Sequence, residues 1–352
     1  MPLSKIRVLI VDDSITFRRA LELGLSQDMN IEIIGTAMDA MDAMEKIKQL
    51  KPDVVTLDVE MPKMNGIEFL KKLMPQYPLP VVVVSSLPIN ALDALSAGAV
   101  DFVRKPVVKG AFDMNNFIGD LTVKVKIASK AHISKPRPSS TPIRPITPLG
   151  GTMNFNNTLS ARNTIVAIGA STGGTEAILE VVQNLPATTP GIIIVQHMPP
   201  VFTNMYAQRL DRICKMHVKE AENGDRVEQG KIIIAAGEYH LRLLKDMNGY
   251  FIRSEPGPKV SGHCPSVDVM FDSVATTAGR NAVGVILTGM GADGAKGITK
   301  LHSTGAYTIG QDKDSCIVYG MPMEAFKLGG ISKQLPLNQI GGEIIRYLNT
   351  KI

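Results

Sequence analysis

The chain has 352 residues, of which 44% are apolar and 20% charged, and this composition is typical of a soluble globular protein with two or three domains. Its longest apolar runs are only as long as strands, which argues against a membrane-spanning helix. The charged N-terminal stretch argues against a signal peptide. The three cysteines lie far apart without metal-ligand spacing, so we expect a reduced, cytoplasmic protein.

The net charge of +5 has a local origin in residues 126–162. This segment has no acidic residue, and its six basic residues account for more than the whole excess: Lys126, Lys130, Lys135, Arg137, Arg144 and Arg162. Because no folded segment is basic, we expect no nucleic-acid binding. The stretch "SKPRPSSTPIRPITPLGG" is rich in Pro and Ser and is typical of a flexible linker. We therefore predict domains at residues 1–125 and 163–352.

Strand and helix signals alternate along the N-terminal domain. Two amphipathic stretches, "ITFRRALELGLSQ" and "AMDAMEKIKQL", predict helices. Five apolar runs predict strands: "IRVLIV", "IEIIGTA", "DVVTLD", "PVVVVSS" and "AVDFVR". Continuous apolar strands separated by helices favour a doubly wound parallel α/β fold of the flavodoxin-like kind.

Charged and polar side chains follow four of these strands. Asp12 and Asp13 come after the first strand, Asp58 ends the third, Ser85 ends the fourth and Lys105 follows the fifth. In a parallel sheet all of them reach one edge. Three crowded carboxylates favour a hard cation such as Mg²⁺, and a lysine with a hydroxyl suits a phosphoryl group. The pattern predicts phosphorylation of an aspartate; helix capping alone would explain only one of the acidic residues.

Through "VDDS", "LDVEMPKMNG", "VVVVSS" and "DFVRKP", the N-terminal domain resembles the receiver domain of bacterial response regulators. The resemblance implies that Asp58 is the phospho-acceptor and that Asp12 and Asp13 are metal ligands. It also implies that Ser85 is the switch hydroxyl, and Phe102 stands where the family places its coupled aromatic residue. A histidine sensor kinase would be the phosphodonor.

The C-terminal domain predicts a second, mostly parallel α/β sheet of Rossmann-like type. Strands are expected at "NTIVAIG", "GIIIVQ", "KIIIAAG", "AVGVIL" and "AYTIG". Helices are expected after Ser171, at "VFTNMYAQRL", from Ser266, after Gly294 and at "LNQIGGEIIRYL". A β-hairpin insert, "HLRLLKDMNGYFIR", is expected to turn at Asn248 and Gly249.

Three catalytic residue types follow strands of this second sheet. Gly169, Ser171 and Gly173 form G-x-S-x-G, which exposes a serine on a strand-to-helix turn. The motif alone is weak, because such a serine can simply cap a helix. His197 ends the next strand, however, and Asp293 follows a later one. A serine nucleophile, a histidine base and an orienting carboxylate are the parts of a catalytic triad.

The stretch "TGMGADG" also fits a different function. Gly289, Gly291 and Gly294 have the G-x-G-x-x-G spacing of a dinucleotide-binding turn, and an acidic pair follows at about the distance of a ribose-binding carboxylate. Such loops usually open the first βαβ unit, whereas this one lies near the end of the chain. Asp293 would also set a negative charge against a pyrophosphate. We therefore expect the glycines to bring backbone N–H groups to an oxyanion.

One other histidine competes for the role of base. His263 lies in "SGHCPS", just before the predicted helix at Ser266. Because His197 ends a strand at the expected site edge, we favour His197. The remaining histidines are expected on surfaces, in the linker or in satisfied hydrogen bonds.

With "IGASTGG", "VQHMPP", "SGHCPSVD" and "LTGMGADG" in that order, the C-terminal domain resembles the catalytic domain of the chemotaxis protein-glutamate methylesterases. The resemblance implies Ser171 as nucleophile, His197 as general base and acid, and Asp293 as the orienting carboxylate. Thr172 and the backbone N–H of Met290 are implied neighbours of the reacting carbonyl.

The resemblance implies a phosphorylation-activated serine hydrolase that demethylates glutamate side chains on the cytoplasmic helices of chemoreceptors and deamidates glutamines. No cofactor is expected in the esterase domain, and membrane association is expected only through the receptors. We expect the unphosphorylated receiver to cover the esterase cleft. Cys264 stands where the family usually has arginine, which affects an ion pair or substrate contact but not the triad.

Three other functions are open at this point: an oxidoreductase, a DNA-binding regulator and a binding adaptor with an inactive triad. The glycine loop argues against the first, and the size and charge of the second domain argue against the second function. Labelling of Ser171 by a fluorophosphonate would exclude the adaptor. The oligomeric state, the receptors and the kinase are left open.

Overall fold

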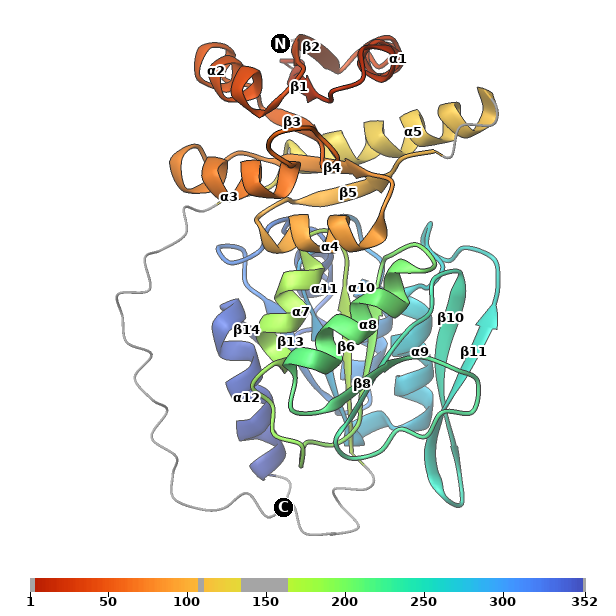
Figure 1. The fold of residues 1–352 in the computed structure, drawn as a ribbon. Coiled ribbons are helices and arrows are strands. Elements are labelled where there is room, and N and C mark those ends of the chain that lie inside the picture. The colour runs from red at the N-terminus through yellow and green to blue at the C-terminus, as the bar shows by residue number, and fades with distance from the viewer. Residues whose placement is uncertain (1–3, 107–110, 134–163, 351–352) are drawn as a thin grey trace. The chain divides into compact units, whose positions relative to one another are not determined.

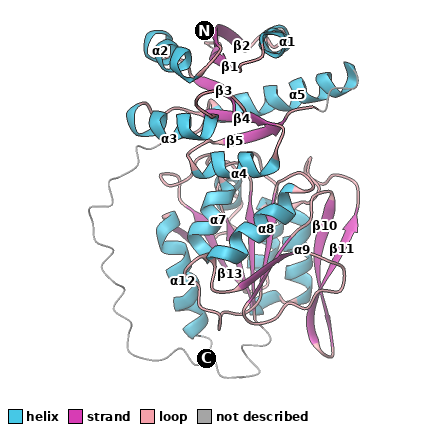
Figure 2. Ribbon diagram, viewed as in Figure 1, coloured by secondary structure: helices cyan, strands magenta, loops and turns pink. Residues whose placement is uncertain are grey.

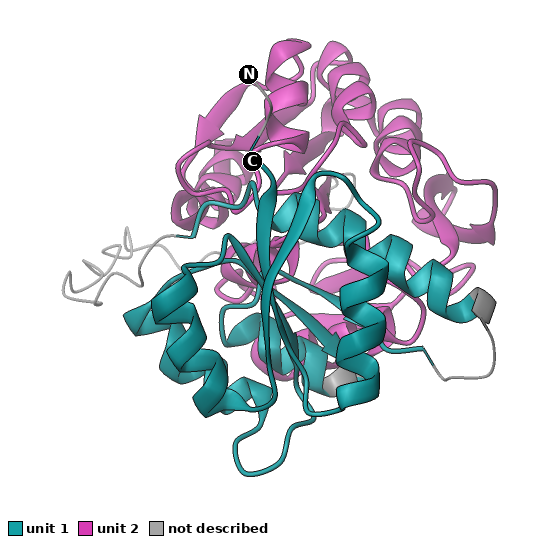
Figure 3. Ribbon diagram, turned by 90° about the horizontal axis from the view of Figure 1, so that it is seen from above, with its two compact units in different colours: residues 1–140 teal, residues 141–352 magenta. Residues whose placement is uncertain are grey.

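The computed structural model describes residues 4–106, 111–133 and 164–350. The chain divides into two compact units, residues 1–140 and 141–352 (Figure 3). The division falls inside the predicted linker, of which residues 134–162 lie outside the described residues. Among the described helices, none combines the length and apolar character needed to cross a bilayer.

The first unit contains a five-stranded parallel sheet in the order β2-β1-β3-β4-β5 (Figure 1). Its strands are β1 (Ile6–Val11), β2 (Ile31–Ala37), β3 (Val54–Asp58), β4 (Val81–Ser85) and β5 (Asp101–Arg104). The interiors of β1, β3 and β4 are fully buried, as expected for a sheet covered on both faces. The predicted doubly wound fold is confirmed for this domain.

Five helices connect and cover these strands. They are α1 (Ile15–Leu25), α2 (Ala40–Leu50), α3 (Gly66–Gln76), α4 (Pro88–Ser96) and α5 (Ala111–Ala128). Short polar residues define three of the starts, because the side chains of Ser14, Asp39 and Asn65 accept backbone N–H groups of the first turn. Helix α1 contacts α5, whereas α3 contacts α2 and α4, which places the helices in two layers.

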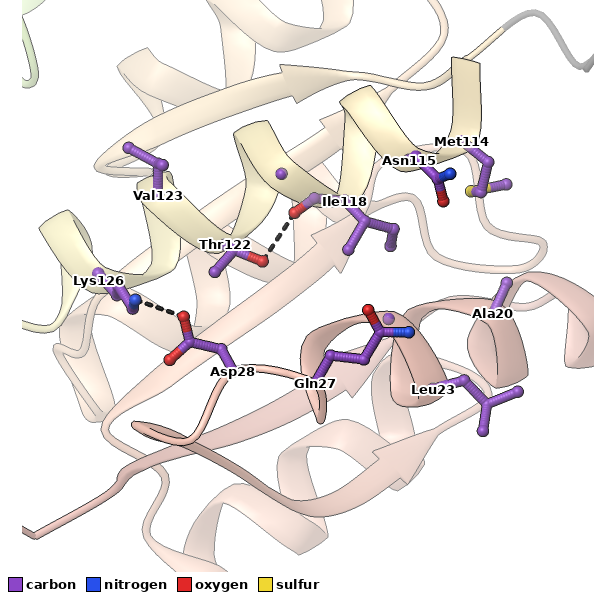
Figure 4. Close-up of a pocket in the computed structure, with 12 residues that line it drawn as sticks. Ala20, Leu23, Gln27, Asp28, Met114, Asn115, Ile118, Thr122, Val123 and Lys126 are labelled. Atoms are coloured by element: carbon purple, nitrogen blue, oxygen red, sulfur yellow. Dashed lines mark hydrogen bonds and ion pairs between the residues drawn. The ribbon is translucent and has the colours of Figure 1, made fainter. Parts of the chain in front are cut away.

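Helix α5 extends past the predicted end of the first domain at residue 125. It ends at Ala128, so the first three residues of the predicted linker are helical. Lys126 pairs with Asp28, and this ion pair closes one end of a hollow of about 690 Å³ between α1 and α5 (Figure 4). Leu23, Ile118 and Val123 line the hollow.

The second unit contains a seven-stranded parallel sheet in the order β14-β13-β12-β6-β7-β9-β8. Five of its strands were predicted: β6 (Ile165–Ala170), β7 (Ile192–Gln196), β9 (Lys231–Ile234), β12 (Ala282–Ile286) and β13 (Tyr307–Gln311). The two edge strands, β8 (His217–Glu220) and β14 (Lys333–Leu335), were not. Both are short and carry few apolar residues, so the sequence gives no strand signal there.

Helices cover both faces of this sheet (Figure 2). They are α7 (Gly174–Val182), α8 (Phe202–Ile213), α9 (Val267–Thr277), α10 (Ala295–Ser303), α11 (Met321–Lys327) and α12 (Leu337–Thr350). Helix α12 packs on α7, while α9 packs on α10 and on the hairpin. A short 3₁₀ helix, Gly279–Asn281, leads into β12. The core on the α9 side includes Met270, Phe271 and Val274, which are fully buried.

The predicted hairpin forms a separate two-stranded sheet of β10 (Tyr239–Asp246) and β11 (Gly249–Pro256). Its turn was predicted one residue too late. Asp246 pairs with Gly249, so Met247 and Asn248 form the loop. The reason is local: the Asp246 carboxylate accepts the N–H of Asn248 at 2.8 Å, a side-chain turn that starts at the aspartate.

Candidate functional site

Ser171 lies on the turn between β6 and α7. Its backbone N–H donates to the carbonyl of Thr288 at 3.0 Å, and its carbonyl accepts from Gly174 at 2.7 Å. Gly173 has φ of 75°, a left-handed conformation that suits glycine and allows the turn to start the helix immediately. Backbone hydrogen bonds thus fix the position of Ser171, and its side-chain hydroxyl is available to other groups of the site. Its own N–H is engaged and is not available to an oxyanion.

His197 follows β7 and joins the serine to a carboxylate. Its Nδ1 lies 3.1 Å from the Ser171 hydroxyl oxygen, and its Nε2 lies 2.8 Å from Asp293 Oδ2. The His197 side chain is 8% exposed and that of Asp293 1%, so the arrangement is largely shielded from water. The ring that takes this place is His197, as the sequence predicted. The competing His263 stacks on it instead, with ring centroids 3.7 Å apart.

The Asp293 carboxylate lies at the N-terminus of α9. It accepts hydrogen bonds from the backbone N–H groups of Val267 at 2.8 Å and Asp268 at 3.0 Å, and from the Ser266 hydroxyl at 2.7 Å. Burial acts to raise the pKa of Asp293, but the hydrogen bonds and the His197 ring outweigh it and hold that pKa below its usual value. The group is therefore an anion that orients His197 through one oxygen.

Sequence reasoning missed two buried side chains that support the triad. The amide Nε2 of Gln196 donates to the carbonyls of Ser171 at 2.9 Å and His197 at 3.2 Å, which links the segment after β6 to the segment after β7. Ser266 was recognised only as a helix start, yet it both caps α9 and binds Asp293. A polar residue at the end of an otherwise apolar buried strand was the available signal for Gln196.

The glycine-rich loop after β12 packs against Ser171. A Cβ at Gly289 would lie 2.7 Å from the Ser171 Cβ, and one at Gly294 would lie 2.4 Å from a Val267 methyl carbon. Met290 lies between these two glycines in the sequence. Thr172, which follows Ser171 in the sequence, is buried. The glycines thus allow close packing of this loop on Ser171 and on Val267.

Three carboxylates meet at the edge of the first sheet. Asp12, Asp13 and Asp58 each offer an oxygen, and these oxygens lie within 4.8 Å of one another. Lys105 Nζ lies 2.9 Å from Asp12 and 2.6 Å from Asp58. Burial acts to lower the pKa of Lys105, but its hydrogen bonds to Asp58 and Asp12 raise it, so it remains a cation. The oxygen donor set fits a hard divalent cation.

The predicted switch residues lie on the neighbouring strands. The Ser85 hydroxyl at the end of β4 lies 3.1 Å from the carbonyl of Leu87 and 3.3 Å from a carboxylate oxygen of Glu60. Phe102 on β5 is 6% exposed, with Lys124 Nζ 5.9 Å from its ring centroid. The sheet thus brings Ser85 and Lys105 to the carboxylate edge, while Phe102 is buried within β5, the strand that Lys105 follows.

Known proteins resemble both halves of the chain. Residues 8–113 match the response regulator receiver domain, and residues 166–344 match the CheB methylesterase domain. This chain is a member of the CheB methylesterase family. A protein-glutamate methylesterase/protein-glutamine glutaminase of Syntrophomonas wolfei is 50% identical over 99% of both chains. One from Salmonella choleraesuis is 46% identical over 99% of this chain and 98% of its own.

Among solved structures, the crystal structure of the Thermotoga maritima CheB methylesterase catalytic domain covers 52% of this chain and 98% of its own. It has 39% sequence identity and a TM-score of 0.51. The family membership predicted from the motifs is confirmed for both domains. The cysteine at position 264, where the family usually has arginine, does not change this family assignment. All three cysteines are free thiols.

Proposed function

We propose that the chain hydrolyses the γ-methyl esters of glutamate side chains in chemoreceptors and deamidates specific receptor glutamines. The observation that carries this proposal is the continuous hydrogen-bonded series Ser171–His197–Asp293, whose members come from three strand ends of one sheet. The names of the curated relatives support the same ester and amide chemistry. The reaction would take place in the cytoplasm, where the receptor helices are accessible.

In the first half of the reaction, the Ser171 hydroxyl attacks the ester carbonyl carbon. Its proton passes to Nδ1 of His197, which lies 3.1 Å away, while the Nε2–H donates to Asp293. The carboxylate therefore selects the tautomer in which Nδ1 is free to accept. His197 then returns the proton to the leaving methoxide, methanol departs, and the glutamyl group remains on Ser171 as an ester.

In the second half, His197 Nδ1 takes a proton from water, which attacks the glutamyl ester, and then returns it to the Ser171 oxygen. The product is the glutamic acid side chain, which releases the second water proton to solvent and becomes a carboxylate. The Met290 N–H and Thr172 are the proposed donors to the oxyanion in both halves, since the Ser171 N–H is engaged by Thr288. The approach of Gly289 to Ser171 supports this role for the loop.

The receiver site is proposed to regulate this activity. Asp12, Asp13 and Asp58 would hold Mg²⁺, which when bound neutralises charge on the phosphoryl group transferred to Asp58. Lys105 and Ser85 would contact the phosphoryl oxygens. A histidine sensor kinase would supply the phosphoryl group. That the unphosphorylated receiver covers the esterase cleft stays a prediction, with phosphorylation shifting the population to an open form.

The test is methanol release from methylated receptor membranes, with and without acetyl phosphate and Mg²⁺. Release is expected to rise on phosphorylation and to vanish in Ser171→Ala. In Asp58→Asn it should stay at its basal level under both conditions. Ester hydrolysis that survives in Ser171→Ala would overturn the nucleophile, and stimulation that survives in Asp58→Asn would overturn the phosphorylation site.

A further inference from the structure

The face of the catalytic imidazole is covered by a second imidazole. The rings of His197 and His263 are nearly parallel, with a 10° angle between their planes and 3.7 Å between their centroids. Hydrogen bonds to Ser171 and Asp293 use the two nitrogens at the edge of the His197 ring. The stack acts perpendicular to these bonds, so it constrains a motion that they do not constrain directly.

A tight turn presents His263 to this position. Val260 and His263 exchange two backbone hydrogen bonds of 3.0 and 2.9 Å around Ser261 and Gly262. The two central residues have φ of 52° and 85°, as in a turn with two left-handed residues. The Ser261 hydroxyl also donates to Asp268 Oδ2 at 3.1 Å, which fastens the turn to the first turn of α9.

The same short segment therefore places two groups around His197. Residues 260–263 hold the ring that covers its face, and the N-terminus of α9, which begins at Val267, holds the Asp293 carboxylate at its edge. The torsion that rotates an imidazole about its Cβ–Cγ bond has broad minima, so the ring plane is poorly fixed by its own rotamer preference. A flat neighbour at stacking distance blocks rotation out of the plane that contains both hydrogen bonds.

The stack also matters while His197 moves the proton of Ser171. Nδ1 and Nε2 keep their partners only while the plane of the ring is unchanged, so a neighbour on the ring face preserves the geometry throughout the transfer. We propose that His263 is a positioning residue that holds the His197 ring in the plane of Ser171 and Asp293 through its aromatic face. This inference rests on the proposed function, because it assigns His197 the role of base.

The experiment compares His263→Ala with two variants that keep a flat ring, His263→Phe and His263→Tyr. Each is measured in the full chain with acetyl phosphate and Mg²⁺, as methanol release and as the rate of Ser171 labelling by a fluorophosphonate. His263→Ala should lower kcat and the labelling rate by the same factor, about 3- to 30-fold, with KM within about twofold. At least one ring-bearing variant should recover to within about threefold of the parent. Unfolding temperatures identify any variant that fails to fold.

Three results would overturn the inference. The ring-bearing variants, folded but as slow as His263→Ala, would show that the nitrogens of His263 matter and not its face. Full activity in His263→Ala would show that the stack is dispensable, and a change confined to KM would assign the residue to substrate contact. Failure of the proposed function is distinguishable, because methanol release would then be absent from the parent chain or would persist in Ser171→Ala.

Discussion

Replacing Gly289 by alanine tests the geometry of the site with a single methyl group. The backbone at Gly289 does not have a left-handed conformation, so an alanine there causes no backbone strain and adds only the volume of its methyl group. Its Cβ would lie 2.7 Å from the Cβ and 3.1 Å from the backbone N of Ser171, and 2.4 Å from Met321 Sδ. Met321 is fully buried, so it has little room to move away.

The size of the displacement follows from these distances. Ordinary carbon–carbon contact begins near 3.4 Å, so the Gly289 loop and Ser171 must separate by about 0.7 Å. A misplacement of about 1 Å in a reacting group costs about 10²-fold in rate, and overpacking of a buried site costs about 1–3 kcal/mol of stability. We therefore expect kcat to fall about 30- to 100-fold, with a folded protein of lower unfolding temperature.

The assay is methanol release under phosphorylating conditions, with fluorophosphonate labelling of Ser171 as a second reading. Gly342→Ala is the matched control, because Gly342 lies exposed in α12 with no atom within 4 Å of an added Cβ. Its activity should equal that of the parent, and its stability should rise by up to about 1 kcal/mol from helix propensity. Activity of Gly289→Ala within threefold of the parent, at unchanged stability, would refute the contact argument.

Two further predictions concern charge. Asp293→Asn should reduce kcat by about 10³- to 10⁴-fold, because the amide no longer selects the His197 tautomer; a loss below tenfold in the methanol assay would contradict the orienting role. The second prediction concerns Glu343. Hydrogen bonds and charge from Arg346 lower the pKa of Glu343 to about 2, because together with the hydrogen bond from the Tyr307 hydroxyl they outweigh the effect of burial. A carboxylate whose pKa is lower in the folded than in the unfolded chain stabilises the fold at pH values above its unfolded pKa, and this stabilisation is lost as the pH falls through its folded pKa. Glu343→Gln should therefore lower the unfolding temperature at pH 7, and the difference from the parent should disappear between about pH 4.5 and 2. An unfolding-temperature difference that is constant over this range would contradict it.

The sequence by itself determined the sheet strands that carry the sites. Apolar runs such as Ile192–Gln196 and Ala282–Ile286 are buried on both faces, and a fully buried strand leaves little choice of secondary structure. Because parallel strands end at one edge, Ser171, His197 and Asp293 could be expected to meet from their positions in the chain alone. The motifs around them determined the family in the same way.

Tertiary structure decided what surrounds these residues. The bonds from Ser266 to Asp293 and from Gln196 to two carbonyls, and the stack of His263 on His197, join segments that the chain order does not pair. The short edge strand β14 exists because β13 offers it hydrogen bonds, not because its residues favour a strand. Periodicity and local capping report a residue's neighbours along the chain, whereas these contacts depend on packing between elements far apart in it.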